Sequence, residues 1–165
     1  MRRNALIVEG NGAAGQKTGA GKVEKIIPMF HIDHLGIAVR DLRQASTFYE
    51  LLGMPVGPVE VVQHEQVRAV MVQAGESRIE LLEPLSPESV IGRFIERRGE
   101  GMHHVALHVD DIEDVFSEMK CAGMRLVSDE LKIGAGGHLY FFVHPSSTGG
   151  VLVEICQNAD ADVAI

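Results

Sequence analysis

Two histidines and two glutamates occupy matching places in a sequence that repeats itself. Residues 34–41 (HLGIAVRD) return 70 residues later as residues 104–111 (HVALHVDD). Residues 79–81 (IEL) return as residues 153–155 (VEI), so the second copy carries a four-residue insertion. Each copy therefore places a histidine near its start and a glutamate near its end, inside apolar runs. The four residues are His34, Glu80, His104 and Glu154.

Imidazole and carboxylate ligands in this number suit one divalent metal ion, with Co, Mn, Ni, Fe or Zn as the candidates. No cysteine belongs to the set, which disfavours a structural zinc site. The glutamates favour a metal in their own right, because a buried carboxylate without a cation is costly. The competing interpretation is that each histidine is an ordinary core or surface residue, as an isolated histidine on a strand most often is.

The remaining histidines lack the support of the repeat. His31 and His103 stand close to His34 and His104, but strand alternation and the repeat register select the latter pair. The others have no partner in the repeat and are expected in surface or loop roles: His64, His108, His138 and His144.

The apolar pattern predicts the elements that position these side chains. Residues 34–39 alternate, so His34 shares one face of a strand with small residues such as Gly36, which leave space beside the imidazole. A helix follows in each copy, with Asp41 and Asp111 as N-caps. The expected apolar stripes are Leu42, Ala45, Tyr49 and Leu52 in the first helix and Ile112, Val115, Met119 and Ala122 in the second. Glycine ends both helices, at Gly53 and Gly123.

Three strand-like runs follow each helix, at residues 55–63, 67–73 and 78–83 and at residues 124–128, 138–143 and 151–156. Each half is thus a β-α-β-β-β module, covering residues 31–85 and 101–157. A linker helix over residues 86–99 joins them; Ser86 is its expected cap, and its apolar face is Val90, Ile91, Phe94 and Ile95. We expect the two sheets to pair face to face. The predicted fold is α+β, with the paired modules forming a curved, barrel-like sheet around a metal cleft, in a domain over residues 28–160.

Composition excludes several classes of partner. The net charge of −8 and pI near 5.4 argue against binding to nucleic acid or to an anionic membrane. No apolar run approaches the roughly 18 residues that a spanning helix needs. The two cysteines, Cys121 and Cys156, have no CxxC spacing and fit a reduced, cytoplasmic protein.

The first 27 residues differ from the rest and are expected to be a flexible leader. They contain a GxGxxG string at residues 10–15, but the second strand and the acidic residue that a dinucleotide site needs are missing. Their basic, acid-poor character leaves a transit peptide as the alternative.

Over residues 31–157 the chain resembles the vicinal oxygen chelate superfamily and, within it, the methylmalonyl-CoA epimerase family. The resemblance rests on residues 32–39 (IDHLGIAV), 79–87 (IELLEPLSP), 99–104 (GEGMHH), 132–136 (KIGAG) and 144–154 (HPSSTGGVLVE). The strings IELLEPLSP and GEGMHH, and the HP and TGGVLVE segments, are specific to the epimerase family.

The resemblance implies a metal ion bound by His34, Glu80, His104 and Glu154, an acyl-CoA substrate and a homodimer. The implied reaction interconverts the C2 stereoisomers of methylmalonyl-CoA by proton abstraction and a metal-stabilised enolate, with Glu154 as the catalytic base. The chain departs from the family in three places. Ala69 replaces a second glutamate of some members, the usual EQGV is shortened at residues 65–67, and Ser146 replaces a lysine.

Three other functions use the same fold. A glyoxalase I-type lactoylglutathione lyase has the same four-ligand arrangement and is the first alternative. A metal-free small-molecule binding protein should lack the ligands, and an extradiol dioxygenase needs only two histidines and one glutamate, which leaves Glu80 without a role.

Overall fold

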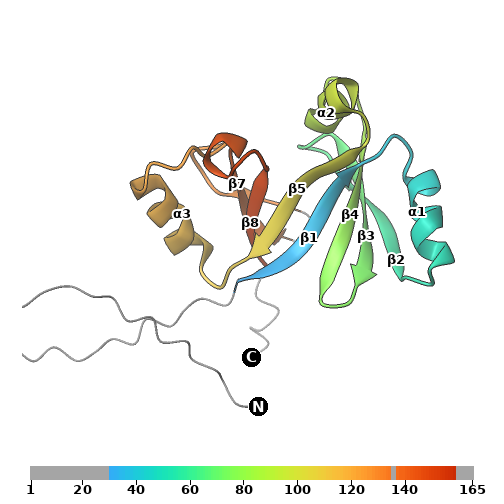
Figure 1. Cartoon of the computed structure of the whole chain (residues 1–165), viewed down its shortest axis with the longest axis horizontal. Helices are drawn as coiled ribbons and strands as arrows, with labels where there is room; N and C mark the ends of the chain where they lie inside the picture. The colour runs from blue at the N-terminus through green and yellow to red at the C-terminus, as the bar shows by residue number, and fades with distance from the viewer. Residues whose placement is uncertain (1–29, 135–136, 159–165) are drawn as a thin grey trace, which may run out of the picture.

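The computed structural model describes residues 30–134 and 137–158, so the predicted leader lies outside the described residues. In chain order the elements are β1 (His31–Ala38), α1 (Leu42–Leu51), β2 (Val56–Val62), β3 (Val67–Ala74), β4 (Ser77–Pro84), α2 (Val90–Arg98), β5 (Gly101–His108), α3 (Ile112–Cys121), β6 (Lys132–Ile133), β7 (Leu139–Val143), the 3-10 helix η2 (Pro145–Ser147) and β8 (Val153–Gln157). Figure 1 shows α1 and α3 at opposite ends of the molecule, with α2 between them. No described helix is both long and apolar enough to cross a membrane.

All eight strands belong to one curved sheet in the order β2-β3-β4-β1-β5-β8-β7-β6. In each half of the chain the first strand pairs in parallel with the last one, β1 with β4 and β5 with β8. We refer to β1–β4 with α1 as the first repeat and to β5–β8 with α3 as the second repeat. The predicted α+β fold of two β-α-β-β-β units forming a curved sheet is confirmed.

The prediction that two sheets pair face to face was wrong, because the two repeats join edge to edge in one sheet. Strands β1 and β5 are antiparallel neighbours, with Leu35 opposite Val105 and Gly36 opposite His104. This arrangement satisfies the backbone hydrogen bonds of two strands that would otherwise be exposed sheet edges. The four innermost strands, β4, β1, β5 and β8, therefore meet at the centre of the molecule.

Both predicted helix caps are present. The Asp41 side chain accepts a hydrogen bond from the backbone N–H of Gln44, and Asp111 accepts one from Asp114. The glycines after the helices, Gly53 and Gly123, have φ values of 75° and 71°. In this left-handed region a residue without Cβ is favoured.

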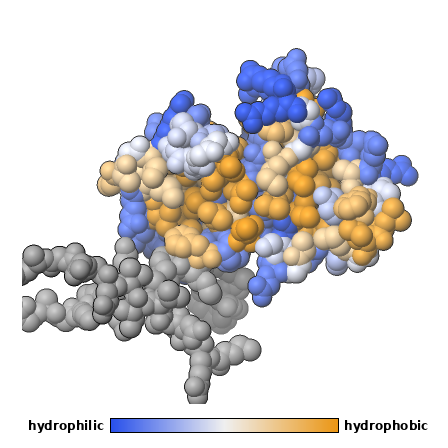
Figure 2. All heavy atoms as spheres, viewed as in Figure 1, coloured by the Kyte–Doolittle hydropathy of each residue, from blue (hydrophilic) through white to orange (hydrophobic). Residues whose placement is uncertain are grey.

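The C-terminal members of the two predicted apolar stripes are not buried. Leu42 and Ile112 are core residues, and the middle members of each stripe pack against the same clusters. Leu52 is 61% exposed, however, and Ala122 is also exposed. Both are the C-cap residues of their helices, so they lie where the chain leaves the helix. Figure 2 shows apolar side chains on the surface over α1.

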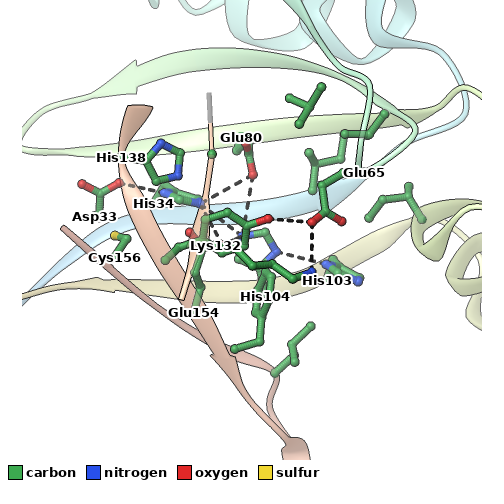
Figure 3. Close-up of a pocket in the computed structure, with 18 of the residues that line it drawn as sticks. Asp33, His34, Glu65, Glu80, His103, His104, Lys132, His138, Glu154 and Cys156 are labelled. Atoms are coloured by element: carbon green, nitrogen blue, oxygen red, sulfur yellow. Dashed lines mark hydrogen bonds and ion pairs between the residues drawn. The ribbon is translucent and has the colours of Figure 1, made fainter. Parts of the chain in front are cut away.

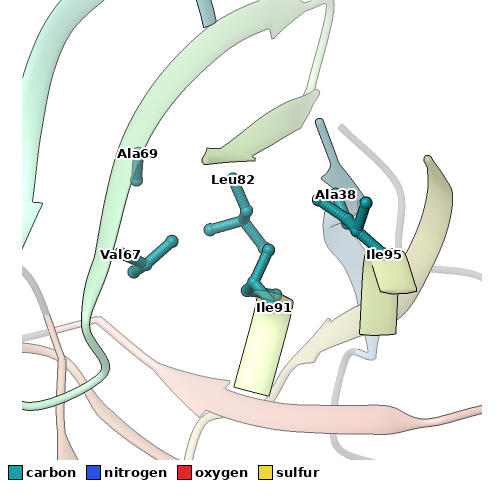
Figure 4. Close-up of a cluster of buried hydrophobic side chains, with 6 residues drawn as sticks. All are labelled: Ala38, Val67, Ala69, Leu82, Ile91 and Ile95. Atoms are coloured by element: carbon teal, nitrogen blue, oxygen red, sulfur yellow. The ribbon is translucent and has the colours of Figure 1, made fainter. Parts of the chain in front are cut away.

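The linker helix begins later than the sequence predicted. Ser89, and not Ser86, is the N-cap of α2 and accepts a hydrogen bond from the N–H of Gly92. Ser86 instead accepts from the N–H of Glu88 within the preceding turn. The helix packs Ile91 and Ile95 against the sheet, in a cluster completed by Ala38, Val67, Ala69 and Leu82 (Figure 4).

The strand predicted at residues 124–128 is reduced to one isolated bridge, between Leu126 and Val143. The N–H of Val127 does donate to the carbonyl of Phe142, but no ladder continues from it. The outer position of the sheet is taken instead by the two-residue strand β6, which pairs with β7 through Lys132–Tyr140 and Ile133–Leu139.

Candidate metal centre

Four neighbouring strands carry the four residues that the repeat singled out. His34 lies on β1, Glu80 on β4, His104 on β5 and Glu154 on β8, so each repeat provides one imidazole and one carboxylate. His34, His104 and Glu154 are buried, with 4%, 3% and 5% of their surface exposed. The Glu80 side chain is 17% exposed.

The ligand atoms of His34, Glu80 and His104 all lie within 4.8 Å of one another, and Glu154 approaches the two histidines. The Nε2 atoms of His34 and His104 are 3.1 Å apart. Glu80 Oε2 lies 3.5 Å from the first of these atoms and 3.6 Å from the second. Glu154 Oε2 lies 3.3 Å from His104 Nε2 and 4.0 Å from His34 Nε2. Ligands held at about 2.1 Å from one ion lie about 3 to 3.5 Å from each other, so the spacing of His34, Glu80 and His104 is close to that of ligands of a shared cation. Glu154 is near enough to His104 to be the fourth ligand.

Gly36 makes room for one of the histidines. A Cβ atom at this position would lie 2.1 Å from Cε1 of His104 and 2.7 Å from its Nε2. Gly36, which shares a strand face with His34, therefore leaves the space that the imidazole of His104 occupies.

Asp33 contacts the candidate centre, although the sequence pattern did not select it. Strict alternation would turn it to the face opposite His34, but the β1–β5 register shifts between Ile32 and His34, and this bulge leaves Asp33 as the extra residue. Its Oδ1 lies 2.7 Å from Nδ1 of His34 and also accepts a hydrogen bond from Arg78. A carboxylate on Nδ1 orients the ring so that Nε2 faces a metal.

The electrostatics of the centre also favour a cation. Burial raises the pKa of Glu154 to about 8, and burial raises the pKa of Glu80 as well. Burial would lower the pKa of His34, but the hydrogen bond to Asp33 and the charges of Glu80 and Glu154 outweigh it and raise this pKa. The pKa of His104 falls well below 6.5, because burial is reinforced by the charge of His34. A divalent ion would hold both carboxylates ionised and both imidazoles neutral.

Other histidines lie near the centre without joining it. His103 faces the neighbouring ring, with its Nδ1 3.0 Å from Nδ1 of His104, and burial lowers its pKa to about 4. The rings of His31 on β1 and His108 on β5 are tilted by 35°, with their centroids 4.8 Å apart. With Asp33 they form a second group of possible ligands. The Asp33 carboxylate of that group already contacts His34 and Arg78.

The four residues open onto a cavity of about 460 Å³. Its apolar wall includes Met71, Leu82 and Phe142, and its polar wall includes Lys132 and Tyr140 from the second repeat. Glu65, in the turn between β2 and β3, also points into this cavity (Figure 3). A cavity of this size and mixed lining suits a small organic substrate bound next to the cation.

Known proteins share both the sequence and the fold. Residues 33–142 match the model of the Glyoxalase/Bleomycin resistance protein/Dioxygenase superfamily. A mitochondrial methylmalonyl-CoA epimerase of Bos taurus is 38% identical, and the match covers 95% of this chain and 89% of that protein. An ethylmalonyl-CoA/methylmalonyl-CoA epimerase of Cereibacter sphaeroides is 37% identical over 76% of this chain and 96% of that protein.

A solved methylmalonyl-CoA epimerase, in complex with methylmalonyl-CoA and NH4+, superimposes with a TM-score of 0.74. It is 34% identical, and the match covers 78% of this chain and 94% of that one. The predicted resemblance is thereby confirmed. The chain belongs to the glyoxalase, bleomycin-resistance and dioxygenase superfamily and, within it, to the methylmalonyl-CoA epimerase family.

Proposed function

We propose that this protein interconverts the C2 stereoisomers of methylmalonyl-CoA and that His34, Glu80, His104 and Glu154 hold one divalent metal ion for this reaction. The observation that carries the proposal is that these four side chains lie close together along one cavity, in a chain related to epimerases along most of its length. When bound there, the ion would act as a Lewis acid toward the oxygens of an acyl thioester.

Glu154 is the proposed base. It is buried, it lies at the cavity, and a carboxylate has two oxygens, so one can ligate while the other accepts a proton. The hydrogen bond to Asp33 fixes the orientation of His34. The apolar side chains that line the cavity would face the substrate carbon. The C2 hydrogen of a malonyl thioester is acidic because two carbonyl groups flank it, which brings its removal within reach of a carboxylate.

The direct test follows the C2 hydrogen of methylmalonyl-CoA in D₂O. We expect loss of the C2 proton signal at a rate that depends on enzyme, and no exchange with succinyl-CoA, which lacks a doubly activated carbon. Faster turnover of the glutathione–methylglyoxal adduct would favour the glyoxalase I-type reaction instead. Full activity after exhaustive chelation would overturn the metal part of the proposal.

Metal binding has its own measurement, independent of catalysis. Equilibrium dialysis with elemental analysis should give about one divalent ion per chain, since the four proposed ligands would share one ion. His104→Ala removes a buried ligand and should abolish this binding. The matched control is His144→Ala, which removes a histidine from the turn that leads into η2 and should leave the stoichiometry unchanged.

Two further properties stay predictions. We propose a homodimer, and sedimentation at micromolar concentration measures it; a monomer would contradict it. We also propose a cytoplasmic location, whereas the Bos taurus relative is named as mitochondrial. Localisation of the tagged full-length chain in its own cell decides between the two.

A further inference from the structure

Inversion at C2 requires a proton to leave from one face of the carbon and another to arrive on the opposite face. Glu154 provides one of the two groups. The other described carboxylates that line the cavity are Asp33, Glu60, Glu65 and Glu80. Asp33 is engaged by His34 and Arg78, Glu80 belongs to the metal centre, and Glu60 is exposed on the outer strand β2. Glu65 is the carboxylate that remains.

The turn between β2 and β3 is built so that Glu65 faces inward. The N–H of Glu65 donates to the carbonyl of Val62 at 3.2 Å, and the N–H of Leu85 donates to the carbonyl of Gln66 at 2.8 Å. Gln66 has a φ of 55°, and among the described residues no other non-glycine residue has a positive φ. A left-handed residue of this kind persists only where the surroundings hold it, and such residues gather at functional sites.

Two side chains of the second repeat hold the Glu65 carboxylate over the cavity. The hydroxyl of Tyr140 donates to Oε1 of Glu65 at 2.6 Å, and Nζ of Lys132 lies 3.4 Å from the same oxygen. Tyr140 is only 5% exposed, so its ring has little freedom to turn away. Glu65 itself is 27% exposed although its neighbours in the turn are solvent-facing. The contacts join a turn of the first repeat to strands of the second.

Glu65 and Glu154 reach the cavity from different walls. Glu154 comes from β8 near the centre of the sheet, and Glu65 comes from the turn between β2 and β3, the two strands at the edge formed by the first repeat. Figure 3 shows the metal centre between the strand that bears Glu154 and the turn that bears Glu65. The two carboxylates are still close enough for the charge of Glu65 to contribute to the raised pKa of Glu154.

We propose that Glu65, held by Tyr140, is the second acid–base group of the epimerase and acts on the face of C2 opposite to Glu154. The proposal rests on the proposed function. In one direction, ionised Glu154 takes the C2 proton. The C–H electron pair forms the C1=C2 bond while the C1=O π pair moves onto the thioester oxygen, which gives the enolate. Protonated Glu65 then gives its proton to the opposite face, and its O–H electrons stay on the carboxylate. The enzyme ends with the proton on Glu154, and exchange with water restores the starting state.

The test compares inversion with isotope exchange for each pure stereoisomer of methylmalonyl-CoA in D₂O. For Glu65→Gln we expect inversion to fall by about 10²- to 10⁴-fold, the usual effect of removing an acid–base group. The isomer whose hydrogen faces Glu154 should still exchange it with retention of configuration. The isomer whose hydrogen faces Glu65 should exchange slowly. Glu76→Gln, in the exposed β3–β4 turn, makes the same change of charge and should behave as the wild type.

The outcomes separate this proposal from the one on which it rests. Wild-type inversion by Glu65→Gln, or equal loss of exchange from both isomers in a folded, metal-binding variant, would overturn the role of Glu65. Wild-type protein that exchanges neither isomer would reject the epimerase function and this proposal with it. If Glu65→Gln does not fold, Tyr140→Phe gives a second reading, because it removes only the hydroxyl. It should lower inversion less, with the same one-sided exchange.

Discussion

His34 and His104 differ in what contacts their second ring nitrogen. Nδ1 of His34 faces the Asp33 carboxylate at 2.7 Å, whereas Nδ1 of His104 faces the ring of His103 at 3.0 Å. A carboxylate partner fixes the proton on Nδ1 and strengthens Nε2 as a ligand, and a neutral ring does so less. The two repeats therefore provide the same proposed ligands, but only His34 has a carboxylate on its second ring nitrogen.

The two glutamates should respond differently to the same substitution. Glu154→Gln keeps an oxygen for the metal but removes the proposed base, so C2 exchange of the isomer whose hydrogen faces Glu154 should fall by about 10²- to 10⁴-fold. Glu80→Gln also keeps an oxygen, and glutamine is a ligand that the resemblance allows there, so most activity should remain. The exchange rates of both variants at saturating metal measure this. If Glu80→Gln were inactive and Glu154→Gln active, Glu80 and not Glu154 would be the base.

Gly36→Ala should disable the centre without replacing any of the proposed ligands. Its Cβ would overlap the His104 ring, with Cε1 at 2.1 Å, so the imidazole must move away. We expect loss of stoichiometric metal binding while the far-ultraviolet circular dichroism stays native. Gly57→Ala, on the outer strand β2, is the control. Its Cβ would meet only the backbone carbonyl of Met71, at 3.1 Å. Unchanged metal affinity in Gly36→Ala would contradict the contact.

At the scale of elements, short-range signals predicted more than long-range ones. The caps Asp41 and Asp111 and the terminating glycines follow from local hydrogen bonding and were correct. The alternation of β1 predicted the face of His34 but not that of Asp33, because a bulge depends on the partner strand. The inward turn of Glu65 depends on Tyr140, 75 residues away, and no local pattern encodes it.

The two candidate caps of the linker helix offer a test of this distinction. Ser89→Ala removes the acceptor for the N–H of Gly92 and should lower the free energy of unfolding by about 1 kcal/mol. Ser86→Ala affects only the turn before α2 and should have a smaller effect. Urea denaturation of both variants measures the difference. An equal loss for both would show that the helix begins earlier than Val90.

At the scale of the whole molecule, the repeat predicted two equivalent units and four residues that lie together, but not how the units join. Their use of β1 and β5 as a common seam depends on edge hydrogen bonds that the apolar pattern of either strand does not reveal. That the four residues hold a metal stays a prediction.

A bound metal ion should raise the Tm of the protein by a larger amount as the pH rises. Burial raises the pKa of Glu154 to about 8, and a raised pKa in the folded state gives stability at low pH that is lost as the pH rises through it. The raised pKa of His34 acts in the same direction, and the lowered pKa of His104 acts only below about pH 6.5. The Tm of metal-free protein should therefore fall between about pH 6.5 and pH 9.

Calorimetry with chelator or with excess divalent ion measures this effect, and the gap between the two Tm values should widen with pH. Glu154→Gln has no carboxyl to titrate, so its metal-free Tm should fall less over the same interval. A gap that is independent of pH would contradict the link between the buried carboxylate and stability.

The seam between β1 and β5 also makes the centre sensitive to how these two strands slide past each other. A slip of two residues would preserve the inward and outward faces of both strands and leave a continuous sheet. It would nevertheless carry His104 about 6.6 Å from its place over Gly36, farther than a single ion can span. Such a molecule would appear folded by circular dichroism but would not bind the metal ion. The two register shifts between β1 and β5 fix this alignment, so ion binding would report that the two strands have paired in the correct register.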